Sequence, residues 1–155
     1  MSTTRIRDHI SVRCHVDEVQ RRLERYFRQR ENSAGVAHLR LRVPLHGLPG
    51  LKGLALEHGV RVIARRERDE QNLNDLIRIS WEPEGDGPFP RFAGTLVTWA
   101  EHNPTRSFIE IDGTYTPPLG VPGEAFDEAV GHAIATRTVR AFLEDVARDI
   151  SGRAA

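Results

Sequence analysis

The sequence contains little cysteine and no long apolar run, and each shortage excludes a class of protein. Cys14 is the single cysteine among 155 residues, so the chain cannot form a disulfide with itself, and no apolar segment of signal-peptide length opens the sequence. No stretch approaches the roughly 20 apolar residues that cross a membrane, and the longest uncharged stretch, 114–123, is interrupted by prolines. We therefore expect a cytoplasmic protein without a membrane span.

The sequence also lacks the motifs of metal and phosphate chemistry. Its seven histidines form no H-E-x-x-H grouping, the lone cysteine forms no C-x-x-C pair, and no G-x-S-x-G motif or glycine-rich phosphate loop occurs. His132 follows Glu128 by four residues, which is the spacing of a surface pair on a helix and also of a general base with its orienting acid. We expect no metal, no cofactor and no catalytic residue that a motif identifies.

Lysine is nearly absent, since 21 of the 22 basic residues are arginines, and the charge is unevenly distributed. Residues 1–78 hold 16 basic and 10 acidic side chains, whereas residues 79–155 hold 6 and 12. Such asymmetry can mark a nucleic-acid surface. The arginines are spread over a helix and three strands with acids between them, as Glu24 lies between Arg22 and Arg25. A solvated face explains this pattern better, and we expect no nucleic-acid partner.

The length of the chain fits one domain with its own core. No internal repeat or low-complexity segment indicates a further unit. We expect this single domain to span residues 1–151, followed by a frayed tail at 152–155.

Alternation of apolar and polar residues predicts six strands, and a change of period predicts two helices. Because no helix separates the later strands, we expect a sequential antiparallel meander rather than parallel crossover units. Residues 44–54 are as apolar as a core segment, but their prolines and glycines forbid a regular element, so we expect this segment to cover something. The predicted strands are 5–12, 38–43, 60–68, 76–82, 92–100 and 107–115, and the first helix begins at Val16 and ends before 32–35.

The last helix carries an unbroken row of residues spaced by four, in which Thr138 is the one polar member. Such a row is inclined to the helix axis by about 26°, so its apolar stripe winds around the helix, as packing on a strongly curved sheet requires. Together with the strand and the Pro/Gly connector before it, this helix predicts a cavity between sheet and helix. The row consists of Phe126, Val130, Ile134, Thr138, Phe142, Val146 and Ile150.

The order of these elements resembles that of the START-like proteins, also called the SRPBCC superfamily or the Bet v 1-like, helix-grip fold. The most specific part is FIEIDGTYTPPLGVPGEAFDEAVGHAIATRTVRAFLEDV, which is similar to the last strand, PPLG turn and gripping helix of bacterial members. VPLHGLPGL and FPRFAGTL also resemble parts of that group, and the resemblance covers nearly the whole chain. At the first helix, RCHVDEV departs from the pattern, because it lacks the small residue and the proline that relatives often place there.

This resemblance implies an α+β helix-grip fold, in which a curved antiparallel sheet wraps a long C-terminal helix and encloses an apolar cavity. Members include lipid carriers, hormone receptors, polyketide cyclases and aromatases, and fold alone does not choose among them. We predict that the chain binds a small apolar molecule, lipid-like or polyketide-like, in this cavity. Two alternatives stay open: a polyketide cyclase or dehydratase that uses the same cavity, and a non-catalytic protein-interaction domain whose core is filled by side chains. The predicted ligand-binding residues are Leu41, Val43, Val62, Trp81, Leu96, Ile109, Ile111, Tyr115, Phe126, Val130, Ile134 and Thr138, with Leu45, Leu48 and Leu51 as a lid over the mouth.

The polar and aromatic candidates each have an ordinary structural explanation beside the functional one. Tyr115 can orient a ligand carbonyl at the end of the cavity, or its hydroxyl can bond nearby backbone. Trp81 can stack on an aromatic ligand or pack in the core. Thr138 can present its hydroxyl to a ligand or donate to its own i−4 carbonyl, which we favour. Arg137 and Arg140 can hold a carboxylate at the cavity mouth, but exposed arginines on a helix are ordinary.

Overall fold

The computed structural model describes residues 4–44, 46–47, 55–68, 75–85, 90–116 and 128–152. All the predicted strands and both helices are present. Within the described ranges, no helix is both long and apolar enough to cross a membrane. The elements are β1 (Thr4–Val12), α1 (Val16–Arg30), β2 (Ala37–Pro44), β3 (Ala55–Arg68), β4 (Asp75–Pro83), β5 (Arg91–Ala100), β6 (Ser107–Thr116) and α2 (Glu128–Gly152).

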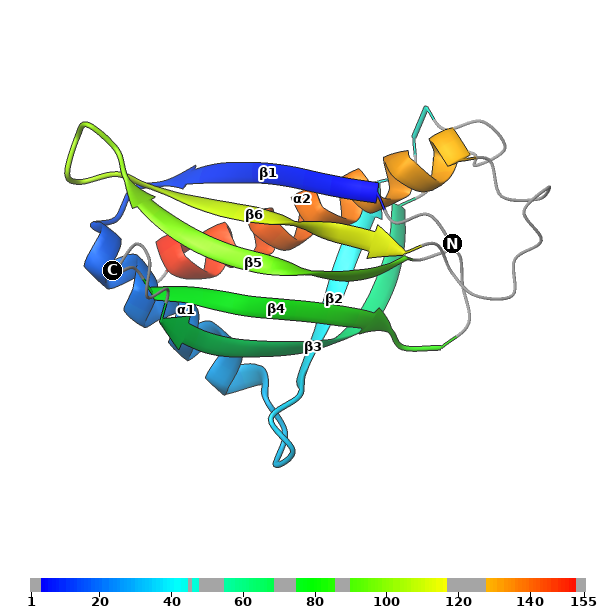
Figure 1. Ribbon diagram of the computed structural model, residues 1–155, viewed down its shortest axis with the longest axis horizontal. Helices are drawn as coiled ribbons and strands as arrows, with labels where there is room; N and C mark the ends of the chain where they lie inside the picture. Colours follow the sequence, from blue (N-terminus) through cyan, green and yellow to red (C-terminus); the bar gives the residue numbers. More distant parts are fainter. Residues whose placement is uncertain are drawn as a thin grey trace.

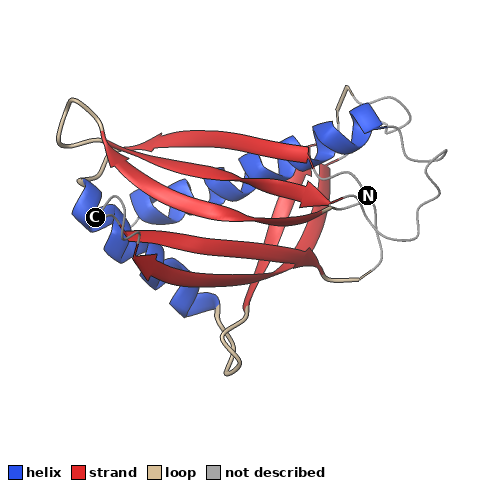
Figure 2. Ribbon diagram, in the orientation of Figure 1, coloured by secondary structure: helices blue, strands red, loops and turns tan. Residues whose placement is uncertain are grey.

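The strands form one antiparallel sheet in the order β1-β6-β5-β4-β3-β2. Strands β2 to β6 are a sequential meander, as predicted, and β1 joins its far edge by pairing with β6. The sheet curls strongly, and α2 lies along its inner side (Figure 1). Because α2 contacts both edge strands, β1 and β2, the helix closes the gap that the curl leaves. The predicted α+β helix-grip architecture, a curved antiparallel sheet wrapped on a long C-terminal helix, is confirmed (Figure 2).

Strand β3 begins at Ala55 and not at the predicted Val60. Its first residues pair with the end of β2, where Ala55 lies opposite Pro44. The prediction was wrong because Gly59 weakens the apolar alternation, whereas the backbone hydrogen bonds of a neighbouring strand do not depend on side chains. Gly59 also marks a close approach, since a Cβ there would come within 2.6 Å of Glu84 Oε2.

Helix α1 begins at Val16, as predicted, although it lacks the usual small residue at its start. His15 takes the N-cap position with an extended backbone, and its Nδ1 accepts a hydrogen bond from the Asp17 amide at 3.3 Å. After the helix ends, the side chain of Asn32 accepts backbone amides in the following turn. The buried face of α1, which packs into the core, consists of Val19, Leu23, Tyr26 and Phe27.

The row of residues spaced by four on α2 faces the interior. From Ile134 to Ile150 its members are at most 2% exposed, and Val130 is half-buried. Phe126 lies outside the described residues. The winding apolar stripe predicted from the sequence is therefore present along the described length of α2.

Two glycines lie opposite each other where β5 and β6 face the interior, Gly94 and Gly113. A Cβ on Gly94 would come within 2.2 Å of the Asp112 carbonyl oxygen, and a Cβ on Gly113 within 2.6 Å of Phe92 Cζ. The ring of Phe92 thus covers Gly113. The close approach of the two strands at this point depends on the absence of both side chains.

Candidate functional site

The inner face of the sheet and the facing side of α2 form the wall where we predicted a ligand. Alternation places the predicted residues on one face of each strand, and all of them except Val130 are at most 4% exposed where the structure describes them. Phe126 and the predicted lid residues Leu45, Leu48 and Leu51 lie outside the described residues. The buried members of the predicted site are Leu41, Val43, Val62, Trp81, Leu96, Ile109, Ile111, Tyr115, Ile134 and Thr138.

Four aromatic rings from four elements meet within this wall. Trp81 of β4 stacks on Phe92 of β5, with ring centroids 4.4 Å apart. Trp81 also meets Phe142 of α2 at 5.3 Å, and Phe142 lies 6.3 Å from Phe27 of α1. We call these four residues the ring cluster. The ring cluster joins the sheet to both helices. The interior around these four rings is therefore packed by side chains.

The hydroxyl of a buried tyrosine meets an exposed imidazole near the end of β6 and the start of α2. Tyr115 is 4% exposed, and its hydroxyl oxygen lies 3.4 Å from Nδ1 of the exposed His132. Tyr115 lies opposite Phe92, which lies opposite Trp81, so this hydroxyl adjoins the ring cluster. A hydroxyl and an imidazole can each donate or accept a proton, and the pair can therefore orient a polar group of a ligand. The side chain of Glu128, the other candidate partner of His132, lies outside the described residues.

Thr138 bonds its own helix, as we favoured from the sequence. Its hydroxyl donates to the carbonyl oxygen of Ile134 at 2.7 Å. Since that bond uses the one hydroxyl proton, Thr138 retains only acceptor capacity toward a ligand.

Arg137 and Arg140 hold α2 to the two edges of the sheet. Arg137 donates to the carbonyl oxygens of Pro44 at 3.0 Å and His46 at 2.7 Å, at the end of β2. Arg140 donates to the carbonyl oxygen of His9 in β1 at 2.8 Å. Arg140 also pairs with the carboxylates of Asp8 and Glu144, each at 3.4 Å, so both arginines have structural partners within the protein.

His58 is a polar residue of the inner face that sequence reasoning missed. It is buried on β3 opposite Leu41, and burial lowers its pKa, against the opposing effect of the Glu84 charge. The signal was present in the sequence, because extending the alternation of Val60 and Val62 backwards places His58 on the same face.

No protein-family model matches the chain, and no curated protein matches it. Among solved structures the chain is similar to Zhui aromatase/cyclase from Streptomyces sp. R1128, with a TM-score of 0.59 and 15% identity over 99% of this chain and 97% of that chain. It is also similar to the protein TTHA0849 from Thermus thermophilus, with a TM-score of 0.53 and 16% identity over 98% of this chain and 100% of that chain. The protein has the START-like fold.

The START-like fold is typical of proteins that hold a hydrophobic ligand in a cavity between sheet and helix. At these identities the likeness shows the fold alone, and a function has to be argued from this chain's own side chains.

On the outer face of the sheet, acidic and basic side chains form ion pairs between neighbouring strands. Such exposed pairs each add little to stability, but they engage arginines from the basic half of the chain. In the part of the chain that the structure describes, no group of three His, Cys, Asp or Glu side chains could hold a metal ion. The cross-strand pairs are Arg5 with Asp112, Arg7 with Glu110, Arg40 with Glu57, Arg61 with Glu82, and Arg78 with Glu67.

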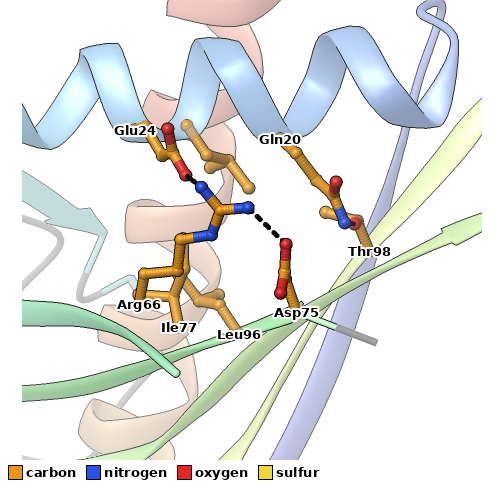
Figure 3. A pocket seen from close by; sticks show the side chains of 8 residues that line it. Gln20, Glu24, Arg66, Asp75, Ile77, Leu96 and Thr98 are labelled. Atoms are coloured by element: carbon orange, nitrogen blue, oxygen red, sulfur yellow. Dashed lines mark hydrogen bonds and ion pairs between the residues drawn. The ribbon is translucent and has the colours of Figure 1, made fainter. Parts of the chain in front are cut away.

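A crevice of about 320 Å³ separates α1 from β3 and β4. Arg66 of β3 crosses this crevice, with one guanidinium nitrogen 2.7 Å from Glu24 of α1 and another bonded to Asp75 of β4 (Figure 3). Behind Arg66 lies a void of about 20 Å³, which is room for roughly one water molecule. The crevice is lined by Glu24, Phe27, Arg28, Glu31, Ala64, Arg66 and Ile77, and the void by Gln20, Leu23, Glu24, Arg66, Asp75, Ile77, Leu96 and Thr98.

Proposed function

We propose that this protein binds a small hydrophobic molecule between the sheet and α2, with its polar group at Tyr115 and His132. The observation that carries the proposal is the hydroxyl of the buried residue Tyr115, which lies at the end of an apolar wall and 3.4 Å from Nδ1 of His132. Ligand sites of this kind combine an apolar lining with a few polar groups that fix orientation. Burial of the ligand would contribute roughly 25 cal/mol per Å² of apolar surface.

The ligand is proposed to lie between the ring cluster and the start of α2. On the far side, Trp81, Phe92 and Phe142 already fill the interior. Toward the start of the helix, α2 contributes the small buried residues Gly131 and Ala135, so it occupies little volume there. The flat faces of the ring cluster would then form the floor of the site.

Trp81 offers a direct reporter of binding. The other tryptophan, Trp99, is 47% exposed on the outer face of β5, so Trp99→Phe isolates the Trp81 emission without disturbing the core. We expect saturable change of that emission when the variant is titrated with a panel of lipid-like and polyketide-like molecules, together with a rise in melting temperature. Trp81→Ala should weaken affinity for the same molecules, and unchanged affinity would remove Trp81 from the site.

A pair of variants on α2 separates this site from nonspecific binding. Ala135→Leu places a leucine at a buried position that faces the proposed site, whereas Thr136→Leu places the same side chain at the next, exposed position. We expect Ala135→Leu to lose ligand affinity while it still unfolds cooperatively, and Thr136→Leu to bind like the original protein. Equal affinity of both variants would contradict the proposed location.

A second candidate function is catalysis of the polyketide cyclase or dehydratase type. It is favoured by the Tyr115–His132 contact, which can pass a proton to or from a carbonyl oxygen held at that end. The name of the similar Streptomyces structure, an aromatase/cyclase, gives the substrate class to try first. On this hypothesis Tyr115→Phe abolishes turnover of a poly-β-keto substrate but retains the melting temperature.

A third candidate, a protein-interaction domain with a filled core, is favoured by the packing of the ring cluster. Mass spectra of protein from its own host, recorded under native and denaturing conditions, distinguish it from the first two. A stoichiometric apolar compound released on denaturation supports the ligand site. No released compound, with no thermal shift across the panel, supports the filled core.

A further inference from the structure

We propose that the crevice between α1 and the β3–β4 hairpin is an entrance to the interior, and that Arg66 is its latch. This inference rests on the proposed function, because it concerns the route by which the small apolar molecule reaches its site. It assigns a role to a part of the molecule, far from Tyr115, that the proposed function leaves unused.

Helix α1 is held firmly on the side that faces α2. The Arg22 guanidinium donates to the carbonyl oxygen of Ile150 at 2.6 Å, and the Tyr26 hydroxyl donates to Asp145 at 2.6 Å. Tyr26 is fully buried, and the Arg30 guanidinium stacks over its ring at 3.8 Å. These partly buried hydrogen bonds to charged groups cost more to break than exposed ion pairs, so this side of α1 is the fixed side.

The opposite side of α1 is held by more exposed contacts. In the ion pair of Arg66 with Glu24, the side chains are 58% and 31% exposed. Gln20 adds a hydrogen bond to Thr98 of β5 at 3.2 Å, as Figure 3 shows. Exposed ion pairs contribute little to stability because water solvates both partners when they separate. Moving the Arg66 side chain away from Glu24, with Leu23 and Phe27 of α1 still packed in the core, therefore has a low free-energy cost.

Opening on this side leads to the predicted ligand-binding wall. Arg66 lies opposite Ile77, Ile77 lies opposite Leu96, and Leu96 lies opposite Ile111. The void behind Arg66 is lined by Leu96 and by Leu23 of α1. Movement of the Arg66 side chain would join this void to the larger crevice, since both spaces share Glu24, Arg66 and Ile77. Beneath the charged side chains of Glu24, Arg66 and Asp75, this passage has an apolar floor of Leu23, Ile77 and Leu96.

The test uses N-phenylnaphthylamine, a neutral dye whose fluorescence rises in apolar surroundings, so that a change of protein charge does not bias its binding. Stopped-flow association and dissociation rates are compared for the full chain and for Arg66→Gln. Arg66→Gln loses the ion pairs with both Glu24 and Asp75, but only the pair with Glu24 joins the hairpin to α1. We expect both rates to rise by about threefold to fivefold, the change that loss of this one exposed pair permits, with the dissociation constant within a factor of two. Glu24→Gln should have the same effect, because it breaks the latch from α1.

Arg78→Gln is the matched control, because it breaks an exposed ion pair with Glu67 on the outer face of the same hairpin, and its rates should not change. Unchanged rates in both latch variants, with normal dye binding, would overturn the entrance and leave the ligand site standing. A weaker affinity caused by faster dissociation alone would overturn the latch, since Arg66 would then contact the dye. Absence of dye binding in the unaltered protein, with no thermal shift, would overturn the ligand site and the entrance together.

Discussion

At the scale of single residues, Tyr26 is the clearest case of a polar group that folding places in the core. Its side chain is fully buried, and its hydroxyl donates to Asp145 at 2.6 Å. Burial raises the pKa of Tyr26 strongly, and the hydrogen bond to the Asp145 carboxylate adds to the effect. The folded protein therefore keeps this proton at a pH where an unfolded tyrosine loses it.

Tyr26→Phe is expected to destabilise the protein by about 1–3 kcal/mol, because the Asp145 carboxylate loses a donor. The unfolded tyrosine ionises near pH 10, so above that pH the folded state binds more protons than the unfolded state, and stability falls as pH rises. Because Tyr26→Phe has no hydroxyl to ionise at this position, the variant should not show this part of the loss of stability at alkaline pH. Denaturant unfolding at neutral pH measures the first effect, and melting temperatures between about pH 8 and 11 measure the second. If the melting temperatures of the original protein and of Tyr26→Phe fell equally over this pH range, the raised pKa of Tyr26 would be contradicted.

Single residues also show how far sequence reasoning reaches into the site. Alternation placed Tyr115 and Trp81 correctly on the buried face, because side chains of a strand alternate regardless of what they later contact. The hydrogen bonds of Arg137 to Pro44 and His46 had no local signal, since the partners lie about ninety positions apart in the chain. The partners of long flexible side chains are decided only when the elements pack together, so the local sequence does not indicate them.

At the scale of elements, the opposed glycines of β5 and β6 set how closely the two strands approach. Gly94→Ala should cost about 3 kcal/mol or more, because its Cβ would come within 2.2 Å of a backbone oxygen of Asp112 that cannot move without breaking the sheet pairing. Gly152→Ala is the control, because a Cβ at Gly152, the last residue of α2, meets nothing within 4 Å. Chemical denaturation of both variants measures the difference. Equal stabilities would show that the strands can separate locally at little cost.

The elements themselves were largely predictable, and their pairing was predictable only in part. The meander from β2 to β6 follows from short connections, which favour pairing of consecutive strands. The position of β1 does not follow from any local pattern, since Thr4 pairs with Tyr115 of β6, which lies far along the chain. The extra length of β3 before Val60 is likewise a product of its partner strand, where Ala55 meets Pro44.

At the scale of the whole molecule, the ring cluster connects the sheet to both helices. Phe142 contacts Phe27 of α1 and Trp81 of β4, and Trp81 contacts Phe92 of β5. The sequence predicts that these residues face inward, but the same inward residues can line a hollow or fill it. Only their packing in three dimensions shows that Trp81, Phe92 and Phe142 fill the interior where they meet.

We therefore propose that residues 1–151 unfold as one cooperative unit centred on Phe142. Phe142→Ala should lower the free energy of unfolding by about 3–5 kcal/mol, the usual cost of removing a large buried ring. Because the ring joins both helices to the sheet, far-ultraviolet circular dichroism and Trp81 emission in the Trp99→Phe background should shift together to lower denaturant. Ile63→Ala, at a position 41% exposed on the outer face, should change stability by no more than about 0.5 kcal/mol. If the helix signal were lost before the Trp81 signal changed, α2 would be gripping the sheet without sharing its core, and the single cooperative unit would be wrong.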